Sequence, residues 1–259
     1  MDSELSRSEV WFSQLVRRVK LDDQMSQFGF LTREDSRLLR MFLHKEDFDV
    51  EKALDSLRNY LDVRVQCQKV FNHYKMDSLI KGIVTKTVLI LPQMSKAGTV
   101  LVFKVGAWNP NDCSIYEISA LLTLLMESVG LDDLRRSCGY SVIYDLKGVF
   151  LKQMHAMRPA VKVLKTISQS YLPSQCKYQL IANAMMPAMV TAMMNLVSFS
   201  KDIKNVPYPR SGDNQKTDLE DIFGADFVPN LPVEYGGSET YDWYESTQKM
   251  VQESLTEFA

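Results

Sequence analysis

The hydrophobic pattern of the chain changes near Lys86, and this change constrains the fold more than any other feature. Before it, apolar residues recur at helical spacing, as in the stretch from Val50 to Leu61, and no strand signal is present. After it, β-rich runs at 88–91, 99–105, 141–146 and 178–183 alternate with helical segments. Strands separated by helices pair in parallel through right-handed crossovers. We therefore expect an α/β domain with a parallel-rich sheet, preceded by a helical module.

Several residues predict where individual elements begin and end. Thr32 with Asp35 resembles a capping box, and Asp49 and Ser114 are good N-caps for the helices that follow them. Proline suits the first turn of a helix, so Pro159 is expected to open one. The apolar run at 88–91 is expected to end at Pro92.

Length and charge exclude several classes of protein. The chain has 259 residues, with 30 basic and 32 acidic side chains, so it is no bulk polycation, and no basic stripe suggests nucleic-acid binding. Its mean hydropathy is −0.16, and no apolar stretch is long enough to span a bilayer. The N-terminal residues carry acids and no apolar signal region. We expect a cytoplasmic protein.

No catalytic or metal-binding pattern is recognisable. The sequence contains no GxSxG elbow, no phosphate-binding GxxxxGK[ST] loop and no HExxH helix. The four cysteines are scattered and form no CxxC pair, and the histidines complete no metal site. Asp145 ends a strand, where a catalytic acid can lie, but no partner accompanies it in sequence, so capping of the following turn is the favoured role. We expect no enzymatic activity, metal or cofactor.

A methionine-rich segment follows the last predicted strand, with five methionines between Met185 and Met194. Its apolar positions form one continuous helical face, and the opposite face is largely apolar too. Two interpretations stay open: an ordinary buried core helix, or a mobile lid over an apolar cavity that rests on a membrane when open. The cations around it suit anionic lipid headgroups, although a solvated basic rim explains them equally well; they are Lys177, Lys201, Lys204 and Arg210.

Four motifs in order resemble the CRAL-TRIO (Sec14-like) lipid-binding family, nearest the subgroup of the α-tocopherol transfer protein, the cellular retinaldehyde-binding protein and the clavesins. The first is the N-terminal helical stretch at 35–53. The others are the strand and WxP turn at 100–110, the "DLxG" strand end at 144–148 and the "LPxEYGG" motif at 231–237. The resemblance implies a helical N-terminal module at 1–85, a CRAL-TRIO domain at 86–238 and a C-terminal tail at 239–259.

In that family a sheet floors an apolar pocket and a gate helix covers it, so the resemblance favours the lid interpretation. By the same matching, the residues expected to contact a ligand come from the long helix after Ser114, two strands, the helix after Pro159 and the gate. They are Ser119, Leu122, Met126, Tyr140, Val142, Tyr144, Leu164, Ile167, Ser168, Leu172, Leu180, Ala182, Met186, Met189, Val190, Met193, Met194 and Val197.

The sequence departs from the family at two places. Asn183 is followed by Ala184 and Met185, where relatives often have a proline two residues on. Relatives that bind phosphoinositides carry paired basic residues before the last strand and after the gate. Here the first pair is Gln175 and Lys177, and the second keeps Lys204 but has Val206. This puts phosphoinositide binding in question, and residues 205–219 read as a loop specific to this chain.

These features predict a soluble, non-enzymatic carrier of one small hydrophobic molecule that it moves between membranes. Tyr140 and Tyr144 leave less room than a two-tailed phospholipid needs, which favours a tocopherol, retinoid or carotenoid, oriented by polar groups at Ser119, Tyr140, Tyr144 and Ser168. The alternatives are a phosphatidylinositol or phospholipid transfer or sensing protein, and a lipid-gated adaptor. The adaptor would bind proteins through its N-terminal helices or its tail, although a tail packed on its own domain is equally compatible with the sequence.

Overall fold

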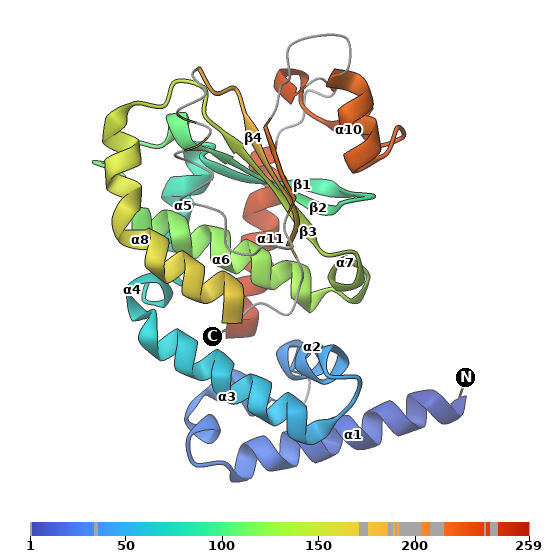
Figure 1. The fold of residues 1–259 in the computed structure, drawn as a ribbon. Helices are drawn as coiled ribbons and strands as arrows, with labels where there is room; N and C mark the ends of the chain where they lie inside the picture. Colours follow the sequence, from blue (N-terminus) through green and yellow to red (C-terminus); the bar gives the residue numbers. More distant parts are fainter. Residues whose placement is uncertain are drawn as a thin grey trace.

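The computed structural model describes residues 2–33, 36–170, 176–185, 189, 191, 204–207, 215–235, 237–238 and 243–258. The first part of the chain is helical, as the spacing predicts (Figure 1). Its elements are α1 Asp2–Leu21, the 3-10 turns η1 Met25–Gln27 and η2 Gly29–Leu31, α2 Arg37–Lys45, α3 Val50–Gln66, α4 Gln68–Phe71 and α5 Met76–Val84.

Short polar side chains cap the starts of α2 and α3, and one predicted cap needs correction. Asp49 caps α3 through a 3.1 Å bond from the Lys52 N–H, as predicted. The predicted capping box at Thr32 is wrong, because Ser36 caps α2 by accepting the Leu39 N–H at 3.3 Å. Thr32 instead donates its hydroxyl to the Gly29 carbonyl, which closes η2.

The sheet runs in the order β1-β2-β3-β4-β5, and its parallel-rich character is confirmed. β1 and β2 form an antiparallel hairpin, while each later neighbouring pair is parallel. β1 does not end at Pro92 as predicted. It is an edge strand with a register shift between Ile90 and Met94, where a proline removes no ladder hydrogen bond. The strands are β1 Val88–Ser95, β2 Gly98–Lys104, β3 Tyr140–Asp145, β4 Cys176–Ala182 and β5 Lys204–Pro207.

Helices follow the strands as crossovers. Ser114 and Glu117 form a complete capping box at the start of the long helix α6. The crossover elements are η3 Val105–Ala107, α6 Ile115–Leu131, α7 Asp133–Cys138 and α8 Leu151–Ser170. Two predictions fail here. Pro159 lies inside α8 and does not open it, and the predicted loop at 205–219 contains the end of β5 and the start of α10 Gln215–Phe223.

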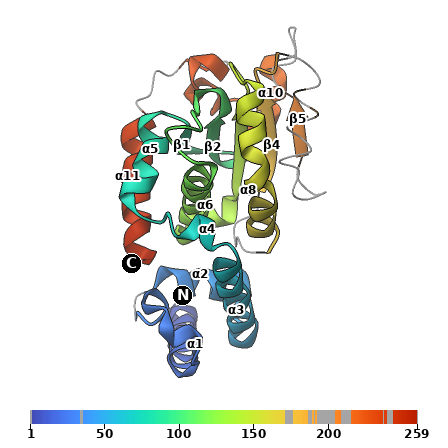
Figure 2. The same cartoon turned by 90° about the vertical axis from the view of Figure 1, so that its left-hand side faces the viewer.

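Each face of the sheet has its own apolar core. We call the face toward α5, α6 and α8 the inner face, and the face toward α10 the outer face (Figures 1 and 2). Alternation along each strand sends neighbours to opposite faces. Val142 belongs to the inner core, for example, and Ile143 to the outer core. The turns η4 Val228–Asn230 and η5 Val233–Tyr235 complete the outer side.

The C-terminal tail forms α11 Trp243–Phe258, which packs against β1, α5 and α6 of its own chain (Figure 2). Thr247 is fully buried in α11, and its hydroxyl oxygen accepts the Ile90 N–H of the edge strand at 3.2 Å. Of the two alternatives left open by the sequence, the structure therefore has the tail packed on its own domain.

Candidate functional site

The inner face carries the tyrosines that the sequence singles out. Tyr140, Val142 and Tyr144 alternate along β3 and are all buried in the inner core. Their partners on β2 are Thr99, Leu101 and Phe103. Burial raises the pKa of both tyrosines well above that of a free tyrosine, so each hydroxyl stays protonated. The face is thus apolar, with phenol groups set into it.

Two predicted site residues on β4 lie on the wrong side. Leu180 and Ala182 pair with Ile143 and Asp145 and pack in the outer core. The residues of β4 that share the inner face with Tyr144 and Val142 are Ile181 and Gln179. The error has a simple origin: the sequence shows an almost continuous apolar run there, and a shift of one residue exchanges the two faces of a strand.

The long helix α6 contributes the predicted positions Ser119, Leu122 and Met126. Leu122 is buried in the inner core and Met126 packs against it. Ser119 is fully buried, but its hydroxyl donates to the Ile115 carbonyl of its own helix at 2.7 Å. The proton of that hydroxyl is therefore engaged within α6, although its oxygen can still accept.

On α8, Ile167 is fully buried in the inner core. Leu164 and Ser168 lie in the same helix, but their side chains are outside the described residues, as is Leu172. Of the predicted gate, Met189 packs against the inner core. The remaining gate positions fall outside the described residues: Met186, Val190, Met193, Met194 and Val197.

The predicted cations are only partly described. Lys177 lies in β4, where the pairing with β3 skips one residue, and it is partly exposed. Lys204 begins β5, but its side chain, together with all of Lys201 and Arg210, is outside the described residues. A headgroup site built on these four residues stays a prediction.

Asp145 has the structural role that the sequence favours. Its Oδ1 accepts the Lys147 N–H and the Asn183 amide, each at 2.9 Å. Its Oδ2 accepts the Tyr235 hydroxyl at 2.8 Å. The carboxylate thus joins the "DLxG" strand end to the "LPxEYGG" motif. It also holds Asn183, which adopts a left-handed conformation directly before the predicted gate.

Gln179 is a polar residue of the inner face that the sequence did not single out. Its side chain is 1% exposed, and its Oε1 has no hydrogen-bond partner. Burial of an amide oxygen without a partner is unfavourable and rare in native proteins. In the sequence, the position could have been found as a polar glutamine in the middle of the otherwise apolar stretch 178–182.

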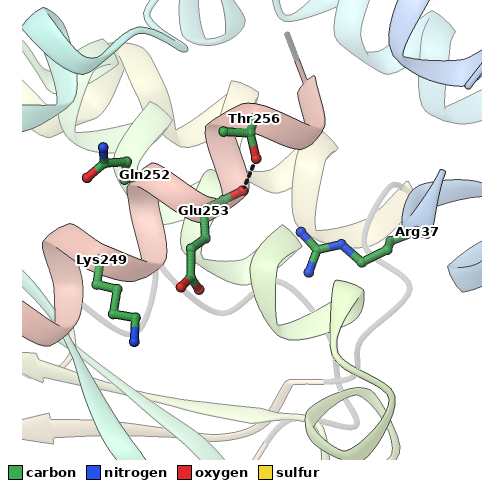
Figure 3. A pocket seen from close by; sticks show the side chains of 5 residues that line it. All are labelled: Arg37, Lys249, Gln252, Glu253 and Thr256. Carbon is green, nitrogen blue, oxygen red and sulfur yellow. Dashed lines mark hydrogen bonds between the residues drawn. The ribbon is translucent and has the colours of Figure 1, made fainter. Parts of the chain in front are cut away.

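Two surface clefts lined by described residues lie elsewhere. One, of about 460 Å³, lies between α11 and the start of α2 and is lined by polar side chains (Figure 3). They are Arg37, Lys249, Gln252, Glu253 and Thr256. The other, of about 610 Å³, runs between α1 and α2 and includes Arg17, Lys20 and Arg40. Neither includes a predicted ligand contact.

Two further observations concern the described part of the chain only. Within it, no three acidic, histidine or cysteine side chains are placed to hold a metal ion. Among the same residues, no helix has the length and apolarity needed to cross a bilayer.

Comparison with known proteins identifies a known domain in the part of the chain that contains the sheet. Residues 85–207 match the model of the CRAL/TRIO domain. The "Alpha-tocopherol transfer protein-like" protein of Homo sapiens is 28% identical over 152 residues, 58% of this chain and 44% of that protein. Its Mus musculus counterpart is 26% identical over 183 residues, 70% of this chain and 53% of that protein. The chain thus spans about half the length of the curated relatives it matches. The solved structure titled "Crystal structure of Sfh5" aligns with a TM-score of 0.48 at 14% identity, covering 93% of this chain and 91% of that one.

Proposed function

The chain belongs to the CRAL-TRIO family, and from this premise we propose that it is a non-enzymatic carrier of one small hydrophobic molecule. The observation that carries the proposal is the CRAL/TRIO domain at residues 85–207. The proposed ligand is a tocopherol, retinoid or carotenoid-like compound, and the name of the alpha-tocopherol transfer protein-like relatives agrees with the first of these. Its transfer from water into an apolar pocket contributes about 25 cal/mol per Å² of apolar surface.

The proposed pocket lies on the inner face of the sheet, between β3, β4, α6 and α8. Tyr140 and Tyr144 narrow this face, which disfavours a lipid with two acyl chains. In the proposed mechanism, the segment 186–199 is the lid, and its opening at a membrane loads and releases the ligand. The helical module at 1–85, the lipid-binding domain at 86–238 and the tail at 239–259 form the proposed division of the chain.

We also propose that the protein is cytoplasmic and that it associates peripherally with membrane surfaces. Exposed apolar side chains support it at the ends of neighbouring strands. Phe150 and Leu151 follow the end of β3 and are 71% and 78% exposed, and Met185 follows the end of β4 and is 77% exposed. Asp145 and Asn183 hold these two strand ends together. Such groups insert into the headgroup region of a bilayer.

Native mass spectrometry of the purified chain, followed by extraction and identification of the released compound, tests the function. A stoichiometric tocopherol, retinoid or other compact hydrophobe is the expected result. A stoichiometric diacyl phospholipid would contradict the ligand class and favour phospholipid transfer or sensing, including phosphoinositide binding. A protein that is empty and takes up no added lipophile would contradict the carrier and favour an adaptor.

A matched pair of variants tests the location of the pocket. Val142→Phe adds volume to the inner face, and Ile143→Phe adds volume one residue away on the outer face. We expect Val142→Phe to lower ligand occupancy at least tenfold with little change in melting temperature, because the ring fills space that the ligand occupies. We expect Ile143→Phe to keep the ligand and to destabilise by about 1–3 kcal/mol through overpacking. Equal ligand occupancy in the two variants would place the pocket elsewhere.

A further inference from the structure

The inner face holds a hydrogen-bonding group that the fold leaves unused. Gln179 lies in the middle of β4, opposite Val142, and is flanked across the strand pair by Tyr140 and Tyr144. Its side chain is almost completely buried, and its Oε1 has no partner. On the same face, Thr99 is fully buried and its Oγ1 also lacks a partner. The apolar face therefore contains polar atoms whose hydrogen bonds the protein does not complete.

Strand pairing and burial together indicate which hydrogen-bonding roles remain free on this face. Gln179 and Tyr144 are diagonal neighbours on the inner face of the β3–β4 pair, and Gln179 partly offsets the rise in the pKa of Tyr144 that burial causes. The Gln179 Oε1 has no partner and is therefore a free acceptor, and the protonated Tyr144 hydroxyl on the same face can donate.

We infer that Gln179, with Tyr144, selects a lipophile that carries a hydroxyl group. A hydroxyl both donates and accepts, so it pairs with the Gln179 Oε1 and with the Tyr144 hydroxyl together. An aldehyde, ketone or ester offers acceptors only and leaves the buried Oε1 unpaired. The inference rests on the proposed carrier function, which it narrows from any compact hydrophobe to a hydrophobic alcohol or phenol.

The expected selectivity follows from the penalty for an unpaired buried polar group. Sites that hydrogen-bond a substrate hydroxyl reject analogues lacking it far more strongly than apolar pockets reject a change of shape. For one neutral hydrogen bond, the penalty corresponds to roughly a 10- to 100-fold difference in affinity.

The test uses the full chain with all-trans-retinol and all-trans-retinal, which differ only in the terminal oxygen group. Titration followed by tryptophan fluorescence gives both dissociation constants. We expect retinol to bind roughly 10- to 100-fold more tightly than retinal. Gln179→Leu should weaken retinol selectively and bring the ratio close to one. Ile181→Val, a change at the next inner-face position of β4, should weaken both probes equally. An unchanged ratio in Gln179→Leu would overturn the inference while leaving the carrier intact.

A second measurement separates this inference from the carrier function. In the ligand-free protein, Gln179→Met removes a buried unpaired oxygen, so its melting temperature should be no lower than that of the wild type. A fall of several degrees would show that Gln179 serves the fold, and would overturn the inference whether or not retinoids bind. If the wild type takes up neither retinoid nor tocopherol while Gln179→Met is not destabilised, the result counts against the carrier and the inference that rests on it.

Discussion

Buried polar residues of this chain differ in whether the fold completes their hydrogen bonds. Asp145 receives three donors, and Ser119 donates within its own helix. Such residues stabilise the structure and offer a ligand little. The Gln179 amide oxygen lies in the same kind of environment without a partner. Sequence alone identified Asp145, because a strand-end motif surrounds it, but it could not show which face Gln179 occupies.

Glu117, at the start of α6, makes a pH-dependent contribution to the stability of the folded protein. Burial raises the pKa of its carboxyl, but hydrogen bonds from Lys81 and Ser114 outweigh burial and hold the pKa below the usual 4.5. The Lys81 Nζ lies 2.7 Å from Oε1, and the Ser114 N–H donates to Oε2 at 2.7 Å. Because the folded pKa is depressed, this contribution is present above the unfolded pKa and is lost as pH falls through the folded pKa.

We therefore expect Glu117→Gln to lower the free energy of unfolding at pH 7 by about 1 kcal/mol, a modest value because Lys81 is half exposed. The difference from the wild type should shrink as the pH falls below about 4. Urea unfolding at pH 7 and at pH 3.5 measures the loss at neutral pH and its decrease in acid. Glu51→Gln, which breaks an exposed ion pair with Arg18, is the control and should change little at either pH. If the difference in free energy of unfolding between the variant and the wild type did not change with pH, the charge of Glu117 would not be its cause.

At the level of elements, local patterns predicted most of the fold. The spacing of Val50, Ala53, Leu54 and Leu57 gave α3, and the β-rich runs gave β1 to β4, because these signals lie within one segment. The predictions that were wrong depend on contacts between segments far apart in the sequence. Pro159 is accommodated inside α8, although it cannot donate a backbone hydrogen bond there. The side of the sheet that Leu180 faces depends on pairing with β3, which no pattern within β4 encodes.

The packing of α11 on β1 gives a prediction for an element that the sequence left ambiguous. The Thr247 oxygen accepts the Ile90 N–H at 3.2 Å and donates its proton to the Trp243 carbonyl at 2.7 Å. Thr247→Val keeps the shape but leaves the Ile90 N–H buried and unpaired. We expect a loss of about 1–3 kcal/mol in the free energy of unfolding, measured by urea denaturation.

The control for that variant is Thr256→Val in the same helix. Thr256 is exposed, and its hydroxyl bonds only to the Glu253 carbonyl one turn away (Figure 3). We expect its effect to stay below about 0.5 kcal/mol. Equal effects of the two variants would mean that α11 contributes helix stability alone and does not protect the edge of β1.

Across the whole molecule, one buried charge connects α3, in the helical first part of the chain, to α6, which packs on the inner face of the sheet. Glu127 of α6 has no exposed side-chain surface, and its carboxylate accepts the Tyr60 hydroxyl at 3.0 Å and the Tyr74 hydroxyl at 2.6 Å. The Arg64 guanidinium of α3 lies 3.5 Å from the same carboxylate. It also lies over the rings of Phe30, Phe71, Tyr74 and Phe258, the last of which belongs to α11. Residues from α3, α6 and α11 thus meet at one ion pair.

This arrangement predicts that the helical module and the α/β domain unfold together. Glu127→Leu leaves the Arg64 charge buried without its carboxylate, and we expect it to destabilise by roughly 3–5 kcal/mol. Tyr74→Phe removes a single hydrogen bond and should cost about 1–2 kcal/mol. Because the two residues share one network, the double variant should be less destabilised than the sum of the single effects. Hydrogen exchange should show faster opening of α3 and α6 to the same extent in Glu127→Leu. Faster exchange in α3 alone would mean that the helical module opens independently, and that Glu127 acts only as its anchor.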